Sequence, residues 1–339
     1  MLIQVAERSE HAVSVFDQAV RRVARGTRYG FAVSAAVLLA LPAAAGAARG
    51  NELPGAGQIE RATARFLDRH AAAPSPPSPR VYRGPAATPL LPSNRVVALY
   101  GAPQMGQTIV GMRSPEGAAQ RLESESAPYA ELGFRPVTGA FDLVAVFATA
   151  GGGPDGLYRT RQDDDVIQIY LDQARAVGAR VILDIQPGRA SVLDELRELR
   201  EWVVQPDVDI AIDPEWNVGR RGIPGRTPGK ISAGKVNRVA QSIARIVRAN
   251  GLPPKLLLVH QFRKGSVNGR TRIRQRADVQ TLLNFDGIGS PAAKRRGYAD
   301  LSVPSLFDGF SLFYRRDTPL MTASSVLELE PEPDFLLYQ

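Results

Sequence analysis

The sequence predicts an α/β fold, a (β/α)8 barrel of the TIM type over residues 95–339, preceded by an export segment and a proline-rich linker. Three observations lead to this prediction. Eight short apolar runs follow one another within these 245 residues, helical or loop segments separate them, and polar side chains recur where the runs end. Parallel strands that are buried on both faces have near-continuous Val, Ile and Leu, and eight of them joined by crossovers form a barrel.

Residues 1–48 are interpreted as a signal peptide or membrane anchor. Within them, residues 30–48 are uncharged and mostly apolar, and four arginines in residues 21–28 precede this stretch. A basic region, an apolar region and small residues such as Ala45-Gly46-Ala47 are typical of a signal peptide. About 19 apolar residues can also just span a bilayer, so an uncleaved anchor is the alternative. We expect the folded part to be secreted, or membrane-anchored and facing outside the cytoplasm.

Residues 49–94 are predicted to be a short helix followed by a linker. The helix is expected at residues 59–72, where apolar side chains have amphipathic spacing, and we expect it to cover the eighth strand, which no later helix follows. Residues 73–94 contain seven prolines. Such a segment cannot form a regular helix or a central strand, so it is expected to be an extended spacer.

The barrel domain is predicted over residues 95–339. Helical spacing is clear in four of the separating segments, whereas residues 263–278 and 287–308 are less regular. An open doubly wound sheet is the alternative fold, but no G-x-G-x-x-G phosphate fingerprint follows the first strand. The strands are expected at residues 95–100, 141–149, 180–186, 208–215, 255–262, 279–286, 309–314 and 334–339, and the helices at 114–131, 163–177, 190–203 and 232–249.

Composition excludes several kinds of chemistry. The chain has no cysteine and three histidines, so thiol catalysis, cysteine-ligated metals and a multi-histidine metal site are not expected, and neither is a cofactor. The Asp163-Asp164-Asp165 run is typical of a helix start and lacks the calcium-loop pattern. The net charge of +8 is uneven: residues 95–217 carry 11 basic and 19 acidic groups, whereas residues 218–306 carry 18 and three.

The basic excess follows the fourth, fifth and sixth predicted strands. These connections lie on the same side of a barrel as the strand ends, so we expect a positively charged rim that binds an anionic polymer. Nucleic acid is not favoured, because few aromatic residues are interleaved with the basic ones. The alternative is that these basic residues form a solvated surface with no binding role. The rim is represented by Arg220, Arg221, Arg263 and Lys264, and its other members are Arg226, Lys230, Arg270, Arg272, Arg274, Arg276, Lys294, Arg295 and Arg296.

Catalysis in such barrels takes place at the carboxyl ends of the strands, which makes the motif Asp213-Pro214-Glu215-Trp216 the strongest candidate. Strand alternation would place Asp213 and Glu215 on one face, and two close carboxyl groups cannot both ionise freely. One would then act as a general acid and the other as an anionic stabiliser, as glycoside hydrolysis requires. The alternative is scaffolding, with Asp213 bonded to a loop backbone and Glu215 paired with an arginine.

Side chains at the other strand ends are candidates for substrate binding. For His260 the alternative is a histidine buried in the core with no part in binding. For Trp216 the two interpretations are a ring on which a sugar stacks and a residue that packs in the core. Asn284 should share the inward face with Asp286. The substrate-binding candidates are Asp184, Gln186, Trp216, His260, Gln261, Asp286, Tyr314 and Tyr100; Asp317 and the terminal Gln339 also stand at strand ends.

The D-x-E sequence at the end of the fourth strand resembles secreted glycoside hydrolases of the chitinase and lysozyme-like types. That resemblance implies that Glu215 is the acid/base and that Asp213 assists an N-acetyl group of the substrate. The chitinase type expects a further Asp where this chain has Ala211. The whole barrel region more closely resembles an uncharacterised actinobacterial family of exported, lipoprotein-like proteins, through Ile185-Gln186-Pro187-Gly188, Asp213-Pro214-Glu215-Trp216, Val259-His260-Gln261-Phe262 and Tyr338-Gln339. This resemblance implies a barrel and no established activity.

Two functions are therefore carried forward. The first is an exported glycoside hydrolase that acts on a cell-envelope or extracellular glycan through carboxylate acid/base chemistry. The second is a non-catalytic envelope protein that binds an anionic polymer through the basic rim.

Overall fold

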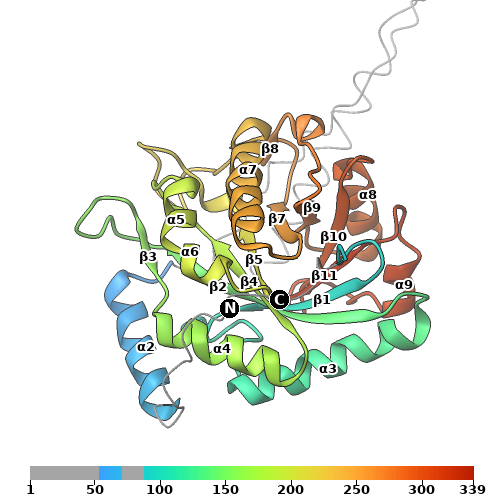
Figure 1. The fold of residues 1–339 in the computed structure, drawn as a ribbon, viewed down its shortest axis with the longest axis horizontal. Coiled ribbons are helices and arrows are strands. Elements are labelled where there is room, and N and C mark those ends of the chain that lie inside the picture. Colours follow the sequence, from blue (N-terminus) through green and yellow to red (C-terminus); the bar gives the residue numbers. More distant parts are fainter. Residues whose placement is uncertain (1–52, 71–87) are drawn as a thin grey trace, which may run out of the picture. The chain divides into compact units, whose positions relative to one another are not determined.

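The computed structural model describes residues 53–70 and 88–339. Eight parallel strands form a closed barrel in which each strand pairs with its neighbour in chain order, and the last strand pairs with the first (Figure 1). Helices alternate with the strands along the chain and lie outside them. The predicted (β/α)8 barrel is thereby confirmed.

The barrel strands lie within a few residues of the predicted runs. They are β1 (Arg95–Gly101), β2 (Val137–Ala148), β4 (Arg180–Ile185), β5 (Val208–Ile212), β7 (Lys255–Gln261), β9 (Val279–Phe285), β10 (Phe307–Leu312) and β11 (Phe335–Tyr338). Short β3 (Arg159–Arg161) pairs antiparallel with β2, and β6 (Ile231–Ser232) pairs with β8 (Val267–Asn268). Because β5 ends at Ile212, the Asp213-Pro214-Glu215 segment lies beyond the strand.

The outer layer contains the predicted helices, with three differences. The predicted helix over 190–203 is divided at Leu199, residues 291–301 form an unpredicted helix, and so do residues 323–327. The Asp163 side chain accepts a hydrogen bond from the Asp165 N–H, which confirms the predicted helix start. The helices are α2 (Ala56–His70), α3 (Pro115–Leu132), α4 (Asp164–Ala176), α5 (Val192–Glu198), α6 (Arg200–Val203), α7 (Ala233–Asn250), α8 (Pro291–Leu301) and α9 (Ala323–Leu327), with 3₁₀ turns η1 (Pro214–Trp216) and η2 (Arg270–Arg272).

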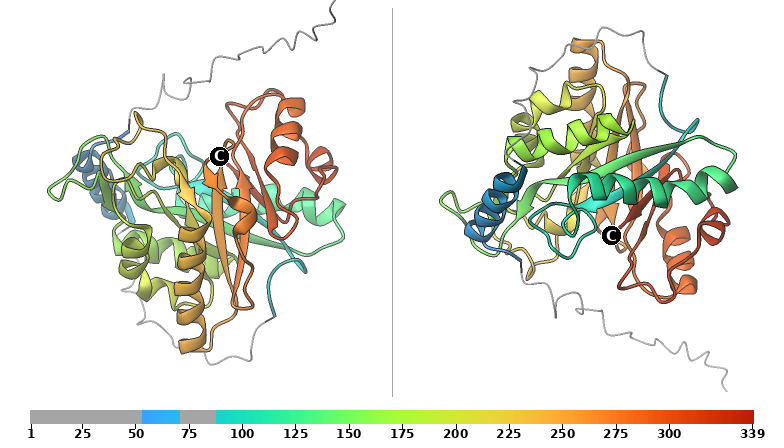
Figure 2. Two further views of the ribbon diagram at one scale, coloured as in Figure 1. Left: turned by 90° about the horizontal axis from the view of Figure 1, so that it is seen from above. Right: turned by 90° about the horizontal axis from the view of Figure 1, so that it is seen from below.

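Helix α2 lies beside α4, which follows β2 (Figure 2). The Phe66 ring stacks on Tyr170 of α4 with centroids 6.1 Å apart, and Gln104 donates a hydrogen bond to the Thr63 hydroxyl at 2.8 Å. The prediction that this helix covers the eighth strand is therefore wrong. Its apolar stripe is instead buried against the helix that covers β2.

The predicted export segment, residues 1–48, and most of the linker lie outside the described residues. Within residues 53–70 and 88–339, no helix is both long and apolar enough to cross a membrane.

At the amino ends of the strands, the inward-facing charges are paired. Asp209 of β5 is fully buried, forms an ion pair with Arg180 at 2.7 Å, and accepts a hydrogen bond from the Leu256 N–H at 2.8 Å. The Lys255 ammonium donates to the Val208 carbonyl at 2.7 Å. These contacts satisfy Asp209 and Lys255 at this end of the barrel, which is typical of a structural role.

Candidate active site

At the carboxyl ends of the strands, inward-facing polar side chains form one cluster, which we call the mouth cluster. The register places Tyr100 beside Asp142 and His260 beside Asn284, and side chains in register on parallel strands point to the same side of the sheet. Its charged members lie close enough to alter one another's pKa. The mouth cluster consists of Tyr100, Asp142, Asp184, Asp213, Glu215, His260, Asn284, Asp286 and Ser311.

His260 lies at the centre of the mouth cluster and is 3% exposed. Its Nδ1 lies 2.7 Å from Asp286 Oδ2, and its Nε2 lies 3.6 Å from Asp142 Oδ2. Burial lowers the pKa of His260, but the negative charge of Asp286 and the carboxylates on both sides raise it well above its ordinary value. The raised pKa favours the imidazolium form of His260, whose Nδ1–H donates to Asp286 Oδ2, whereas its Nε2 has no hydrogen-bond partner among the described residues.

Asp286 is held in place by three neighbours. Besides His260, Asn284 Nδ2 donates to Asp286 Oδ1 at 2.6 Å, and the Ser311 hydroxyl donates to the same oxygen. Gly309 lies against the Asn284 side chain, where a Cβ atom would overlap the amide oxygen. The arrangement fixes the position of Asp286 at the rim of the barrel.

Asp142 and Asp184 lie below the mouth and are fully buried. Among the described residues, no hydrogen-bond partner reaches any of their four carboxyl oxygens. Burial raises the pKa of Asp142, and it raises that of Asp184 well above its ordinary value; the positive charge of His260 opposes both shifts. Buried carboxyl groups without partners are costly, so a functional reason for them is expected.

Asp213 stands directly after β5 and is half-buried. Its Oδ1 accepts a hydrogen bond from the Glu215 N–H at 3.0 Å, which caps the 3₁₀ turn η1. Burial raises the pKa of Asp213 to about 6, His260 opposes the increase, and Asp286 adds to it. The contact between Asp213 and a loop backbone, which the sequence analysis gave as the alternative, is therefore present. The same side chain also belongs to the mouth cluster.

Glu215 lies on η1, so the prediction that strand alternation positions it is wrong. The turn brings it to the cluster instead, because Asp213 caps its first residues. Glu215 is half-buried and has no ion pair with any described residue. Burial and the charges of Asp213 and Asp286 raise the pKa of Glu215 to about 7, although Arg316 and Arg263 lower it. Near neutral pH, Glu215 can therefore give or take a proton.

The η1 turn is held in place by the segment around Gly229, which the sequence analysis did not identify. The Gly229 N–H donates to the Glu215 carbonyl at 3.0 Å, and a Cβ atom at Gly229 would overlap the carbonyl oxygens of Pro214 and Glu215. Asn217 Nδ2 donates to the Lys230 carbonyl at 2.7 Å. Only glycine allows the backbone at position 229 to come this close to η1. This close contact fixes the direction of the Glu215 side chain.

Two other predicted residues support the cluster. Gln186 is buried, donates to the Tyr100 hydroxyl at 2.8 Å and accepts from the Ala148 N–H at 3.1 Å. It orients Tyr100, whose ring lies edge-on to His260 with centroids 6.4 Å apart. Trp216 is half-buried, and its side chain lowers the pKa of Asp213. The structure therefore brings Gln186, Tyr100 and Trp216 to the site.

Gln261 and Tyr314 lie apart from the mouth cluster. Gln261 is buried and donates to the Leu301 carbonyl of α8 at 3.0 Å, because it alternates with His260 and points outward. The Tyr314 hydroxyl donates to Glu125 of α3, and its ring stacks on Tyr338 with centroids 5.5 Å apart. The prediction that these two side chains contact the substrate does not fit their positions.

Asp317 and Lys294 form a buried ion pair outside the mouth cluster. Asp317 also accepts hydrogen bonds from Phe313 N–H at 2.9 Å and Gly289 N–H at 3.1 Å. The Lys294 ammonium donates to the Ser311 carbonyl at 2.7 Å. Lys294 is fully buried, so its assignment to an exposed rim is wrong.

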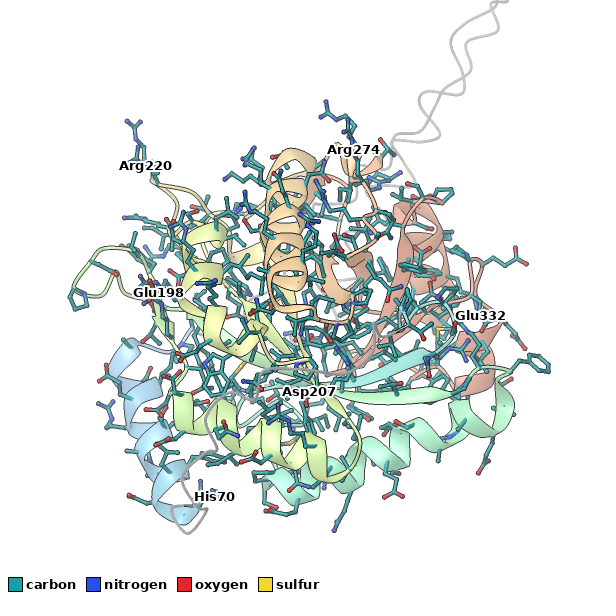
Figure 3. The ribbon with its side chains drawn as sticks, viewed as in Figure 1. His70, Glu198, Asp207, Arg220, Arg274 and Glu332 are labelled. Atoms are coloured by element: carbon teal, nitrogen blue, oxygen red, sulfur yellow. The ribbon has the colours of Figure 1, made fainter. Side chains whose placement is uncertain are left out.

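Seven of the ten arginines of the predicted rim are exposed, whereas Arg270, Arg276 and Arg295 are half-buried. Figure 3 shows the Arg220 and Arg274 side chains extending away from the ribbon. Arg220, Arg221 and Arg263 have no ion pair with a described residue, whereas Lys264 pairs with Asp300 at 3.0 Å. The Arg263 guanidinium lies 5.2 Å from the centre of the Phe262 ring. Arg263 also acts on the Glu215 carboxyl, so the rim reaches the mouth cluster.

Within the described part of the chain, no group of three or more His, Cys, Asp or Glu residues is arranged to hold a metal ion. No protein-family model matches this chain, and no curated protein shows significant sequence similarity to it. The chemistry of the mouth cluster is therefore the basis for a functional proposal.

Proposed function

We propose that this protein is an exported glycoside hydrolase that cleaves a cell-envelope or extracellular glycan at the mouth cluster. The observation that carries the proposal is the pair formed by Asp213 and Glu215. The Asp213 side chain caps the turn that carries Glu215, and the pKa values of the two groups are raised to about 6 and about 7. Two adjacent carboxyl groups whose pKa values are both raised towards neutrality are what general-acid hydrolysis of a glycosidic bond needs.

In this proposal Glu215 protonates the oxygen of the leaving sugar as the glycosidic C–O bond breaks, and a water molecule then adds to the anomeric carbon and returns a proton to Glu215. Its half-buried carboxyl is kept neutral up to about pH 7 by burial and by the charges of Asp213 and Asp286. Asp213 accepts the hydrogen bond from the Glu215 N–H, and in this proposal it is the anion that stabilises positive charge developing on the sugar ring. His260 and Asp286 form the fixed ion pair against which the substrate is positioned.

The proposed location rests on sequence. An apolar segment preceded by arginines at residues 21–28 favours export or anchoring in the membrane, and the actinobacterial family that the barrel resembles is exported. A carboxylate pair at the carboxyl ends of barrel strands also agrees with the D-x-E resemblance to chitinase-type and lysozyme-like enzymes. An envelope glycan is the substrate class that fits both the proposed export and the resemblance to chitinase-type and lysozyme-like enzymes.

The experiment is hydrolysis of purified cell-wall glycans by the full chain and by Glu215→Gln. The variant keeps the shape of the side chain and removes its proton, so we expect activity to fall about 10²- to 10⁴-fold. Asp165→Asn is the matched control, because Asp165 is an exposed acidic residue in the first turn of α4 and lies outside the cluster. Unchanged hydrolysis in Glu215→Gln would contradict the proposed role.

A second function, non-catalytic binding of an anionic polymer, is favoured by the rim. Arg220, Arg221 and Arg226 are exposed in the β5–α7 connection and have no ion pair with a described residue. A group of unpaired cations raises the local concentration of polyanions.

The test of this second function is binding of polyphosphate at increasing salt. We expect affinity to fall steeply with salt, and to fall further in an Arg220→Ser/Arg221→Ser double variant. Arg245→Ser, on the exposed face of α7, is the control. Binding that is indifferent to Glu215→Gln, with no turnover of any wall glycan, would favour this function over hydrolysis.

A further inference from the structure

The interior of the barrel beneath the mouth holds buried polar atoms without partners. Both carboxyl oxygens of Asp142, both of Asp184, the Nε2 of His260 and the Oδ1 of Asn284 form no hydrogen bond with any described residue. Their side chains are at most 3% exposed. Buried polar atoms are almost always paired with protein, water or a ligand. Six such atoms on four strands of one barrel therefore call for a common partner.

His260 and Asp142 face each other across a gap. His260 Nε2 lies 3.6 Å from Asp142 Oδ2, which is longer than a hydrogen bond, whereas Nδ1 on the other side of the ring lies 2.7 Å from Asp286 Oδ2. Tyr100, whose hydroxyl accepts from Gln186 at 2.8 Å, lies edge-on to the same ring. The imidazole is thus anchored through Nδ1, and it presents Nε2 to a partner that is not among the described residues.

Asp184 lies on the neighbouring strand, on the same inner face. In the register of β2 and β4 it stands two residues beyond Asp142, and Ala211 of β5 is in register with it. The inward positions below Asp142 hold Ala140 and, in register with Ala140, Ala98. Alanine has no side-chain atom that can pair with a carboxyl group, and it occupies less volume than the branched residues that usually fill such a barrel. Small and unpartnered polar side chains therefore replace part of the branched apolar core at this level.

These atoms lie deeper in the barrel than the proposed acid. Asp213 follows Ala211 by two residues on the inward side of β5, and its side chain caps the turn that carries Glu215. Asp213 and Glu215 are half-buried and the Asp286 side chain is 15% exposed, so solvent approaches from their side. A sugar whose glycosidic oxygen contacts Glu215 would therefore direct its ring substituents towards the unpartnered atoms.

We propose that these atoms bind the free hydroxyl groups of an uncharged sugar, with one hydroxyl bridging His260 Nε2 and Asp142 and a second bound by Asp184. We call the four side chains, Asp142, Asp184, His260 and Asn284, the hydroxyl site. A hydroxyl group is both donor and acceptor, so one hydroxyl can accept from Nε2–H and donate to a carboxyl oxygen. Burial raises the pKa of Asp142 and of Asp184, which favours neutral carboxyl groups, and a neutral carboxyl group likewise both donates and accepts. This inference rests on the proposed function and deepens it by naming the part of the substrate that is recognised.

Other substituents fit the hydroxyl site less well. An ammonium group has three donors and no acceptor, so it leaves the Nε2–H of His260 unpaired and meets the positive charge favoured there. A carboxylate accepts from Nε2–H but has no donor for the oxygens of Asp142. An acetamido group would bury its methyl group against carboxyl oxygens, which costs their desolvation. The sugar bound beside Glu215 should therefore carry free hydroxyl groups, in contrast to the N-acetyl substrate that the chitinase-type resemblance implies.

The experiment is titration of the full chain with monosaccharides, followed at His260 by NMR. The chain has three histidines, so labelling with nitrogen-15 histidine gives few signals, and the His260 signal is the one lost in His260→Gln. The probes are glucose, galactose, mannose, xylose and arabinose, together with the 2-acetamido derivatives of the three hexoses. We expect at least one neutral sugar to shift the Nε2 signal with a dissociation constant on the order of millimolar. Each acetamido derivative should bind about tenfold more weakly than that sugar. His70, on α2, is the internal control and should not shift.

A matched pair of variants separates binding from folding. Asp184→Leu keeps the branched shape and removes a carboxyl group that has no partner among the described residues. It should weaken sugar binding about tenfold or more, and it should raise the urea midpoint of unfolding, because a buried polar group without a partner destabilises the fold. Asp209→Leu is the control, since Asp209 is equally buried but forms an ion pair with Arg180 at 2.7 Å, and its replacement should lower the midpoint.

Four results would overturn the inference. They are no shift of the His260 signal by any neutral sugar, an acetamido derivative that binds as tightly as its parent, wild-type binding in Asp184→Leu, or a midpoint lowered in Asp184→Leu as in Asp209→Leu. The last result would show that ordered water pairs with Asp184 and that no ligand is needed.

Failure of the proposed function has a different signature, because binding of a monosaccharide does not require proton transfer from Glu215. Sugar binding at His260 without hydrolysis of any glycan by the wild type would contradict the hydrolase and leave the hydroxyl site standing. Hydrolysis of a glycan by the wild type, with no shift at His260 by any sugar, would do the reverse.

Discussion

Replacing His260 by glutamine tests the electrostatic account of the mouth cluster most directly. The substitution removes the cation between Asp286 and Asp142 and keeps a polar side chain of similar length. The two N–O separations are 2.7 and 3.6 Å. At an effective dielectric constant of about 20, these correspond to attractions of about 6 and 5 kcal/mol before desolvation is counted. Measured losses on breaking a buried pair are smaller, about 3–5 kcal/mol, because desolvation offsets the attraction.

We therefore expect His260→Gln to lower the free energy of unfolding by about 3–5 kcal/mol at pH 8. The loss should be larger at pH 5. The pKa of His260 is raised in the folded state, so its contribution to stability is fully present below the pKa of an unfolded histidine, about 6.5, and declines as the pH rises above that value. Urea unfolding at both pH values, followed by tryptophan fluorescence, measures the difference.

The matched control is His70→Gln. His70 lies on α2, where its ring stacks on Phe66 and its Nδ1 contacts the Phe66 carbonyl at 2.7 Å, so the substitution removes a histidine without a carboxylate partner. Its effect should be small and should not depend on pH between 5 and 8 as that of His260 does. A His260→Gln loss below about 1 kcal/mol at pH 8, or one equal at both pH values, would refute the reasoning.

Three further predictions follow from the same contacts. Gly229→Ala should shift the turn that carries Glu215 and lower hydrolysis about 10²-fold, with a smaller effect on unfolding; normal activity would show that this approach is not needed. Asp213→Asn removes a charge that raises the Glu215 pKa, so the alkaline limit of activity should move to lower pH, and a move to higher pH would contradict the coupling. Lys294→Met leaves Asp317 buried without its cation and should cost about 3–5 kcal/mol in urea unfolding, whereas Arg245→Ser should cost less than about 0.5 kcal/mol.

The strands could be predicted because buried parallel strands leave a simple record in the sequence. Runs such as residues 180–186 and 255–262 are nearly continuous in branched and apolar residues, and the observed strands there differ by one residue. Helix α8 was harder to predict, because its sequence is mostly small and basic and its apolar stripe is short. The exposed residues of α8 do not reveal a helical repeat in the sequence.

The mouth cluster could be predicted only where a polar residue stood at the end of a run. Asp184, Asp213 and His260 meet that condition. Asp142 does not, because it stands in the middle of β2, and its one signal is an acidic residue surrounded by apolar ones. Ser311 carries no charge and gave no signal at all.

Two further differences have separate causes, one in the local backbone and one in a contact between distant segments. The sequence argument extended strand alternation through Glu215, but Pro214 begins a 3₁₀ turn and alternation ends with the strand. Lys294 was assigned to the rim by its place in a βα connection, yet Asp317, some 23 residues later, draws it inward. Pairing between distant segments depends on the fold and cannot be read from either segment alone.

The unpartnered carboxyl groups beneath the mouth also affect how the whole protein responds to acid. Asp142, Asp184 and Asp213 have pKa values raised above those of an unfolded chain, and the pKa of His260 is raised as well. The folded barrel therefore takes up protons at the mouth that the unfolded chain does not hold. By linkage, this contribution to stability increases as the pH falls from about 8 to 4, the opposite of the trend that usually causes acid denaturation. The mouth cluster thus acts as a proton reservoir that favours the folded state in acidic surroundings.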